Sequence, residues 1–303
     1  MLFTEKLRPR VDILQLALLE QKKIEGEVAR LDLVDPVISG NKWFKLKEYI
    51  GEALKENKTS IATFGGPFSN HIIATAAICK KYGLTSIGII RGDQPKILST
   101  TLKQVIELGM ILFFAEKEKY KSKEIPQSVH DNYPGVYVIN EGGYGLLGMK
   151  GAASILQLLG AKKYTHILAA VGTGTTLAGL VESSEVQQQV IGISSMKNNF
   201  ELESQINHLV SAENKNRFQL LHGYHVGGYA KFNSELIHFM NNWYLTTDIP
   251  SDFVYTGKLF YGIIDLIQKH YFPPSSTLVL VHSGGILQPL TAASTSIPGS
   301  EYE

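Results

Sequence analysis

The chain has 303 residues, of which 44% are hydrophobic and 19% are charged, so it can bury a sizeable core as one large or two medium domains. Its 29 lysines and arginines against 28 aspartates and glutamates leave a formal net charge of +1, which argues against nucleic acid or an anionic membrane surface as a partner. Because no stretch approaches the roughly 20 apolar residues of a membrane span, and the charged segment 1–10 lacks the apolar core of a signal peptide, we expect a cytoplasmic protein with a small-molecule substrate.

Short apolar runs alternate with stretches of helical periodicity along most of the chain, a pattern typical of parallel sheets covered by helices. The fold class is therefore predicted to be α/β. Strands are predicted at residues 61–64, 86–90, 111–114, 136–139, 166–171, 190–193 and 277–281. Helices are predicted at about residues 43–57, 69–82, 99–108, 146–159, 175–182, 233–243 and 258–270. The charges of residues 116–124 alternate in sign, which indicates a solvated helix face.

The order of these elements predicts two domains. Residues 43–143 form a smaller α/β domain, and residues 1–42 join residues 144–303 in a larger α/β domain. Because ligands of such sheets gather at the carboxyl ends of the strands, we expect the functional site in a cleft between the two domains.

Cysteine and histidine offer little sign of a metal site. The single cysteine, Cys79, has no partner for a disulfide or a thiolate cluster, which fits a reducing compartment, and its small and apolar neighbours indicate a packed helix. His222 and His225 have a loosely metal-like spacing, but no carboxylate or cysteine in the sequence pattern completes a site. We therefore predict no metal.

Three glycine-bearing loops follow predicted strands and lead into helices or toward the chain end, at residues 65–71, 172–176 and 282–285. Such loops either present backbone N–H groups to an anion or simply make tight turns. The middle loop is the best phosphate cradle, because its glycines permit close approach and its threonines add hydroxyl donors. Its members are Gly172, Thr173, Gly174, Thr175 and Thr176.

The same loop loosely matches a dinucleotide fingerprint, since Gly-x-Gly follows a strand and Ala178-Gly179 lies in the next helix. A nicotinamide site would need an acidic residue roughly 20 residues further on, after the next strand. That strand is followed by Ser194, Ser195 and Met196, so NAD is disfavoured.

Lys42 stands directly after Gly40-Asn41 at the start of a predicted helix. A helix N-terminus depresses the pKa of an ammonium group, so a lysine in this position can act as a nucleophile toward a carbonyl. Taken alone, the same lysine would more often be a surface residue.

Taken together, these features resemble the 1-aminocyclopropane-1-carboxylate deaminase and D-cysteine desulfhydrase family, pyridoxal phosphate enzymes of the two-domain tryptophan synthase β type. The resemblance runs from about Arg30 to Gly285 through six ordered motifs. They are Gly40-Asn41-Lys42-x-x-Lys45-Leu46, Ser69-Asn70-His71, Gly142-Gly143, residues 172–176, Val254-Tyr255-Thr256-Gly257-Lys258 and His282-Ser283-Gly284-Gly285.

The resemblance implies a role for each matching residue. Lys42 would hold pyridoxal 5'-phosphate as a Schiff base, Asn70 would meet its 3-hydroxyl, and residues 172–176 would hold its phosphate. Ser69, with Asn70 and His71, would bind the carboxylate of a small amino-acid substrate. Tyr229 and Tyr255 match the family's two active-site tyrosines, Ser283 would meet the pyridine nitrogen, and a homodimer is implied.

Two positions separate the members of this family. Where the deaminases have glutamate and leucine, this chain has Thr256 and Ser283, like the hydroxyl residues of the desulfhydrases. Other positions depart from the family pattern, because Ser39, Phe44 and Phe68 stand where glycine, arginine and glutamine are usual. These aromatic residues could reshape the pocket for a different amino acid.

Three hypotheses follow. The favoured one is a desulfhydrase-like α,β-elimination from a small amino acid that gives an oxoacid and ammonia, with Lys42 removing the Cα proton and a tyrosine assisting. This is the chemistry of a lyase or deaminase, with a hydrolase-like final step. The second is ring opening of 1-aminocyclopropane-1-carboxylate to 2-oxobutyrate and ammonia. The third is a non-catalytic α/β protein that binds a phosphorylated ligand at residues 172–176.

Overall fold

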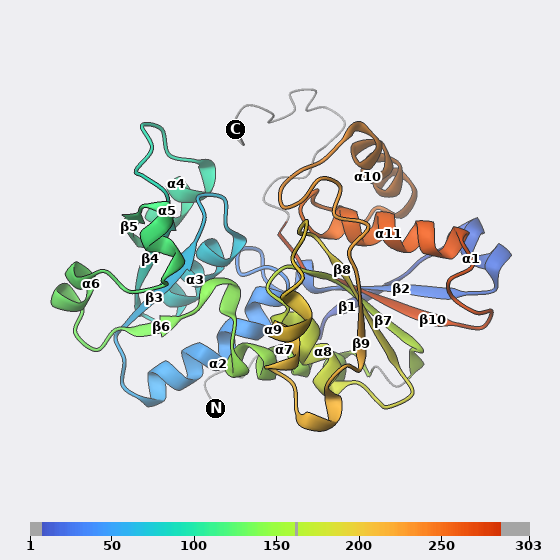
Figure 1. Cartoon of the computed structure of the whole chain (residues 1–303), viewed down its shortest axis with the longest axis horizontal. Helices are drawn as coiled ribbons and strands as arrows, with labels where there is room; N and C mark the ends of the chain where they lie inside the picture. The colour runs from blue at the N-terminus through green and yellow to red at the C-terminus, as the bar shows by residue number, and fades with distance from the viewer. Residues whose placement is uncertain (1–7, 161–162, 286–303) are drawn as a thin grey trace.

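Two separate sheets organise the computed structural model, which describes residues 8–160 and 163–285 (Figure 1). The smaller sheet consists of β3 (Ser60–Gly65), β4 (Thr85–Arg91), β5 (Ile111–Ala115) and β6 (Tyr137–Ile139). Its order is β5-β4-β3-β6, and every neighbouring pair is parallel. All six residues of β3 are buried, as expected for a parallel strand covered on both faces.

The larger sheet has six strands. They are β1 (Arg10–Ile13), β2 (Glu25–Arg30), β7 (His166–Val171), β8 (Gln189–Ser194), β9 (Phe218–Leu221) and β10 (Thr277–His282). Their order is β1-β2-β10-β7-β8-β9. Only the pairing of β1 with β2, at one edge, is antiparallel. Strand β2 thus brings the start of the chain next to β10, which lies near its end.

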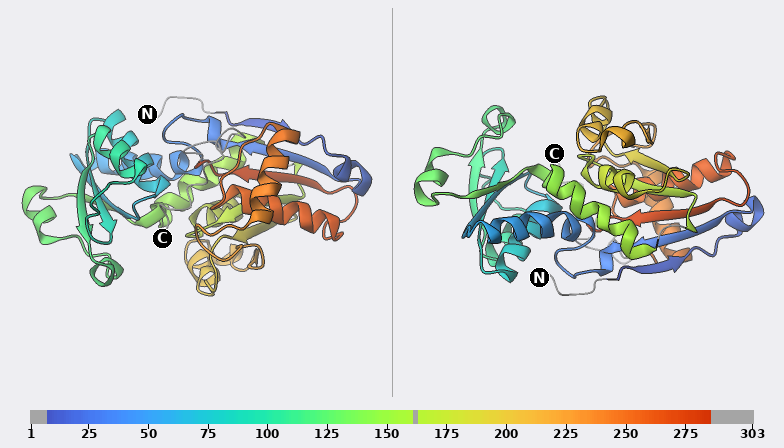
Figure 2. Two further views of the ribbon diagram at one scale, coloured as in Figure 1. Left: turned by 90° about the horizontal axis from the view of Figure 1, so that it is seen from above. Right: turned by 90° about the horizontal axis from the view of Figure 1, so that it is seen from below.

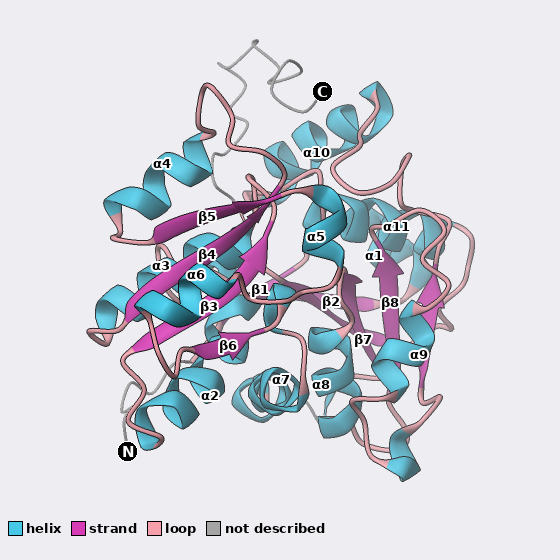
Figure 3. Cartoon of the chain, turned by 60° about the vertical axis from the view of Figure 1, so that its left-hand side comes forward, coloured by secondary structure: helices cyan, strands magenta, loops and turns pink. Residues whose placement is uncertain are grey.

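Helices cover both faces of each sheet (Figure 3). On the smaller sheet, α3 (Asn70–Lys81) and α4 (Thr100–Glu107) cover one face, and α5 (Lys117–Lys121) and α6 (Gln127–Asn132) cover the other. On the larger sheet, one face packs against α1 (Ala17–Lys22), α10 (Ser234–Thr247) and α11 (Thr256–Gln268). The opposite face packs against α2 (Asn41–Lys55), α7 (Leu146–Leu159), α8 (Thr175–Ser183) and α9 (Leu202–Asn207).

One hydrophobic cluster joins the two sheets. It contains Ile61 and Ile139 of the smaller sheet and Val279 and Val281 of the larger one, all of them fully buried. Figure 2 shows α2 and α7 running between the sheets, where their apolar faces contribute to this cluster. The carboxyl ends of strands from both sheets are thereby held in a fixed relation to each other.

The predicted α/β class is confirmed, and so are the predicted elements. Each of the seven predicted strands is present within one residue of its predicted ends, and each of the seven predicted helices within four. The segment of alternating charges, residues 116–124, contains helix α5. Cys79 is buried in α3, as predicted. Strands β1, β2 and β9 and helices α1, α6 and α9 were not predicted. The domain division at residues 43 and 143 stays a prediction, although the smaller sheet lies within it.

None of the helices in residues 8–160 and 163–285 is both long and apolar enough to cross a bilayer.

Candidate active site

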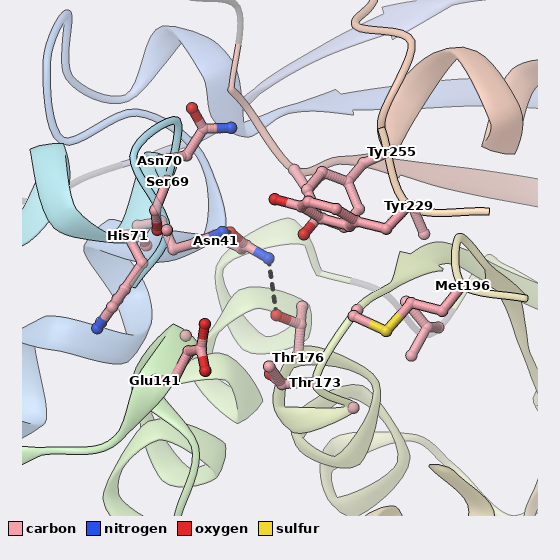
Figure 4. Close-up of a pocket in the computed structure, with 18 of the residues that line it drawn as sticks. Asn41, Ser69, Asn70, His71, Glu141, Thr173, Thr176, Met196, Tyr229 and Tyr255 are labelled. Carbon is pink, nitrogen blue, oxygen red and sulfur yellow. Dashed lines mark hydrogen bonds between the residues drawn. The ribbon is translucent and has the colours of Figure 1, made fainter. Parts of the chain in front are cut away.

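A cavity of about 500 Å³ lies where the N-termini of α2, α3 and α8 meet (Figure 4). All but one of the residues to which the sequence analysis gave a role in cofactor or substrate binding or in catalysis line it. They are Lys42, Ser69, Asn70, His71, Gly172, Thr173, Gly174, Thr176, Tyr229, Tyr255 and Ser283. The exception is Thr175, which is fully buried, with its Oγ1 atom 3.2 Å from that of Thr173. The hydroxyl of Thr175 therefore contacts the hydroxyl of Thr173 in the same loop and does not face the cavity.

Backbone contacts between two distant loops position Lys42. Gly40 has φ +71°, and a Cβ at this position would lie 1.9 Å from the carbonyl oxygen of Ser283. That same oxygen accepts a hydrogen bond from the Asn41 amide at 3.2 Å. Lys42 Nζ donates to Asn41 Oδ1 at 2.8 Å. Burial lowers the pKa of the Lys42 ammonium to about 8, although the Asp252 carboxylate opposes the shift, so a fraction of the amine is neutral near pH 7.

The close approach at Gly40 leads to a prediction. Gly40→Ala should lower the free energy of unfolding more than Gly83→Ala, because both glycines have a similar positive φ but only Gly40 has neighbours within 4 Å of the added Cβ. The strained backbone alone costs roughly 1–3 kcal/mol at either position. Urea unfolding of the two variants measures the difference. Equal losses would mean that the contact with Ser283 does not constrain the loop.

The loop after β7 forms a cradle at the start of α8. Gly174, with φ +82°, precedes the first residue of the helix, whose first amide groups have no partners within the helix. Asn41 Nδ2 donates to Thr176 Oγ1 at 2.8 Å, which ties the start of α2 to this loop (Figure 4). The cradle therefore offers amides, hydroxyls and a helix dipole to an anion.

Lys45 is a residue of the cavity to which the sequence analysis assigned no role. Its side chain is 3% exposed, and its Nζ donates to the carbonyl oxygen of Gly142. Within the described part of the chain, no carboxylate forms an ion pair with it. Burial, and then the charge of Lys42, hold its pKa well below the usual range. Its spacing from Lys42, one helical turn, was the only sequence signal.

The hydrogen bonds of His71 fix its tautomer. Thr63 Oγ1 donates its single proton to the carbonyl oxygen of Ile139 at 2.7 Å, so it must accept from His71 Nε2, which lies 2.8 Å away. His71 Nδ1 is then an unprotonated acceptor, and it is buried without a hydrogen-bond partner in residues 8–160 and 163–285. Burial, Lys45 and Lys42 hold the pKa of His71 well below its usual range. His71 is therefore a neutral hydrogen-bond acceptor beside the cavity.

Two buried histidines predict acid sensitivity. His282 also has a lowered pKa through burial, and it is neutral because its Nε2 donates to Pro250 and its Nδ1 accepts from the Gly284 amide. In the unfolded chain both histidines bind protons below about pH 6.5, whereas in the folded chain they resist protonation. Stability should thus fall as the pH drops through this range, by up to roughly 1.4 kcal/mol per pH unit for each histidine. Urea midpoints at pH 7.5 and 5.5 measure the effect.

The matched comparison for this prediction is between His71→Gln and His130→Gln, because His130 is exposed. The pH dependence should weaken in the first variant and stay the same in the second. An unchanged dependence in His71→Gln would contradict the assignment of His71.

Two tyrosines form the wall opposite the loop of Ser69 (Figure 4). The rings of Tyr229 and Tyr255 meet edge to face, with centroids 6.1 Å apart. Burial is the main cause that raises the pKa of both phenols, and for Tyr255 the neighbouring Tyr229 adds to the rise. Both hydroxyls are thus protonated at neutral pH and can donate a proton or a hydrogen bond.

Thr256, one of the two positions that separate the family members, lies outside the cavity. Its side chain is fully buried and does not line the cavity. Its Oγ1 donates to Asp252 Oδ2 at 2.6 Å and accepts from the Asp252 amide at 2.8 Å, an arrangement that caps α11. Of the two hydroxyl residues used to separate the family members, only Ser283 therefore faces the cavity.

The rim carries three residues that were not predicted, Arg91, Glu141 and Met196. Glu141 forms an ion pair with Lys123, whose Nζ lies 2.6 Å from its Oε2. No short motif contains these residues, so nothing in the sequence pattern marked them.

The spacing of His222 and His225 drew attention in the sequence, and a carboxylate does lie beside the first of them. His222 Nε2 is 2.8 Å from Glu203 Oε1, a neighbour that the sequence pattern did not reveal. Even so, the described residues contain no group of three or more side chains that could hold a metal ion.

Comparison with known proteins shows similarity along almost the whole chain. A family model described as "Pyridoxal-phosphate dependent enzyme" matches residues 11–284. A candidate 1-aminocyclopropane-1-carboxylate deaminase from Thermotoga maritima is 31% identical over 279 residues, covering 86% of this chain and 88% of that protein. The D-cysteine desulfhydrase of Klebsiella pneumoniae is 26% identical over 281 residues, covering 85% and 86%. The crystal structure of an ACC deaminase homologue matches with a TM-score of 0.82 at 26% identity, covering 93% and 91%.

Proposed function

The chain belongs to the pyridoxal-phosphate dependent enzyme family, and on that premise we propose that it eliminates a β-substituent from a small amino acid, as a D-cysteine desulfhydrase does. Because the family consists of enzymes, the hypothesis of a non-catalytic phosphate-binding protein is set aside. None of the relatives described above is named a hydrolase, so that part of the predicted enzyme class is not supported.

The residues of the cavity fit pyridoxal phosphate. Lys45 is a buried amine that lacks an anionic partner among the described residues, and the loop of residues 172–176 presents both its glycines and two of its threonines to the cavity. The buried Oδ1 atom of Asn70 also has no hydrogen-bond partner among the described residues. A ligand that combines a phosphate, a polar ring substituent and an aldehyde would satisfy these groups and the Lys42 amine together.

We assign the holding of the cofactor to four parts of the cavity. Lys42 Nζ would bond to the aldehyde carbon, the start of α8 and Lys45 would bind the phosphate, and Asn70 would meet the 3-hydroxyl. Ser283 offers a neutral hydroxyl to the pyridine nitrogen. A hydroxyl at that place leaves the ring less charged than a carboxylate would.

The chain's own residues then act on the substrate. When bound, pyridoxal phosphate supplies an electron sink for the charge left at Cα. Ser69 and the free amides at the start of α3 bind the substrate carboxylate. Lys42, with its lowered pKa, accepts the Cα proton, and the protonated phenols of Tyr229 and Tyr255 donate toward the departing group.

Ser283 in the cavity wall is the observation that favours elimination over ring opening. The test is a panel of D-cysteine, L-cysteine and 1-aminocyclopropane-1-carboxylate, with oxoacid release as the readout. Pyruvate and sulfide from either cysteine are expected. If only the cyclopropane substrate reacted, and released 2-oxobutyrate, the result would instead support ring opening as the function. The Thermotoga maritima relative is named for that activity.

We also propose that the enzyme is a cytoplasmic homodimer and that residues 43–143 form its smaller domain. The family resemblance supports the dimer, and the buried unpaired thiol of Cys79 fits a reducing compartment. The position of the smaller sheet, within residues 60–139, supports the domain division. Sedimentation analysis of the purified protein tests the dimer.

A further inference from the structure

Arg91 brings an additional cation to the cavity. It is the last residue of β4, beside the end of β3, and its side chain lines the cavity. Its Nη2 atom lies 3.8 Å from the place that a Cβ on Gly66 would occupy. The guanidinium therefore lies over the beginning of the loop that leads to Ser69, the residue to which we assign the substrate carboxylate.

This guanidinium is unpaired. Within residues 8–160 and 163–285, Arg91 has neither a hydrogen bond nor an ion pair. The acidic residue at the same rim, Glu141, is already paired with Lys123 at 2.6 Å. Arg91 is exposed, and it thus adds a positive charge without an ion-pair partner among the described residues to a cavity that already contains Lys42 and Lys45.

The Arg91 charge also acts across the mouth of the cavity. Burial raises the pKa of Tyr229, the charge of Glu141 adds to that rise, and the charge of Arg91 opposes it. Tyr229 lies on the wall opposite the Ser69 loop (Figure 4). A substrate group beyond the α-carbon would lie between these two walls.

The other cationic and dipolar groups of the cavity already have anions assigned to them. The start of α8 and Lys45 take the phosphate of the cofactor, and the start of α3 with Ser69 takes the α-carboxylate. We propose that Arg91 determines specificity by binding an anionic group on the β-substituent of the substrate. The preferred substrates would then be amino acids with an acidic β-substituent. This inference rests on the proposed elimination.

The chemistry explains why a cation is useful here. In the elimination, Lys42 takes the Cα proton, the bond from Cβ to the leaving group breaks, and its electron pair departs with that group. Water then converts the remaining enamine to pyruvate and ammonium. An acidic leaving group is charged before the bond breaks and stays charged afterwards, so an ion pair with Arg91 would hold it in the ground state and in the transition state, which a neutral substituent cannot gain in the ground state. A planar guanidinium can hold two oxygens of such a group at once.

The experiment compares two substrates that differ in the charge of the β-substituent, O-phosphoserine and β-chloroalanine, each supplied in both stereochemical forms to the holoenzyme. Arg91→Gln should lower kcat/KM for O-phosphoserine by roughly 10–100-fold relative to β-chloroalanine, the range expected when a hydrogen-bonded charge pair is lost. Arg91→Lys should restore part of the loss. Lys96→Gln is the matched control, because Lys96 is exposed in the same segment and does not line the cavity, and it should leave the ratio unchanged.

Binding of malonate and of acetate, measured by calorimetry, tests Arg91 without turnover. Arg91→Gln should weaken the binding of malonate, which has two carboxylates, roughly tenfold or more. The binding of acetate, which has one, should be unchanged. An equal loss for both substrates, or no change in the ratio and in malonate binding, would overturn the proposal. If neither substrate is turned over, the elimination itself is wrong, and the malonate titration still decides whether Arg91 binds an anion.

Discussion

Replacing Lys42 with alanine is expected to lower turnover of every amino-acid substrate by about 10³-fold or more, because one side chain both bonds to the cofactor and moves the Cα proton. No other amine can take over both tasks. Lys45 is the nearest lysine in the helix, but it is buried against the Gly142 carbonyl. Lys42→Ala should therefore still bind pyridoxal phosphate through its phosphate, without a covalent bond.

Borohydride reduction followed by peptide mapping measures the covalent bond directly. In the wild-type protein the label should be found on Lys42, and in Lys42→Ala it should be absent. Lys47→Ala is the control, since Lys47 lies on the same helix but donates to Ser154 Oγ and does not line the cavity. Labelling of another lysine, or full activity in Lys42→Ala, would refute the assignment.

The lowered pKa of Lys42 adds a pH dependence to this result. Only the neutral amine attacks the aldehyde of the cofactor, and its fraction increases with pH until the pKa is passed. Because burial places that pKa at about 8, the rate at which the apoprotein captures pyridoxal phosphate should rise from pH 6 to 8 and then level off. A rate that kept rising to pH 10 would indicate an ordinary exposed lysine.

The strands that could be predicted are those whose sequence shows their burial. Strand β7 reads as a nearly continuous apolar run because helices cover both of its faces. Strand β2 could not be found in this way, since charged residues occupy both of its ends and its middle. Glu27 of β2 is bound by Lys163 and Tyr164, which lie more than 130 residues away, and Arg30 is bound by Asp12 and Asp32. Except for Asp32, which is two residues from Arg30, these partners come together only in the folded chain.

In the candidate site, too, residues within local motifs could be predicted, whereas residues whose role depends on distant partners could not. Residues within local motifs, such as Lys42 and Ser69, could be placed from the sequence because the motif itself carries the information. The location of Thr256 outside the cavity could not be read from the motif, because its hydrogen-bond partner Asp252 lies outside that motif. Lys45 lies in the motif of Lys42, but the motif gave it no role, and Arg91 lies in no motif. A single cation is informative only when its burial or its lack of a partner is known.

Lys45 is therefore the residue for which the structure makes the most specific prediction. Replacing it with methionine, which has a similar length and no charge, should weaken pyridoxal phosphate binding by roughly 10–100-fold, because the phosphate loses a charged hydrogen-bond donor. Equilibrium titration of the apoprotein with the cofactor gives the dissociation constant. Lys47→Met, on the same helix but outside the cavity, should bind the cofactor normally.

The same Lys45→Met substitution that weakens cofactor binding should increase the stability of the apoprotein. In the unfolded chain Lys45 is protonated at pH 7, whereas burial in the folded apoprotein holds its pKa well below the usual range. The unfolded state thus binds more protons, and the buried amine lowers the free energy of unfolding at every pH below about 10.4. Lys45→Met removes this cost, so the apoprotein should become more stable in urea at pH 7 while the cofactor binds less tightly. A variant that loses stability and keeps its affinity for the cofactor would show that Lys45 serves only to hold Gly142, and the phosphate would then depend on the start of α8 alone.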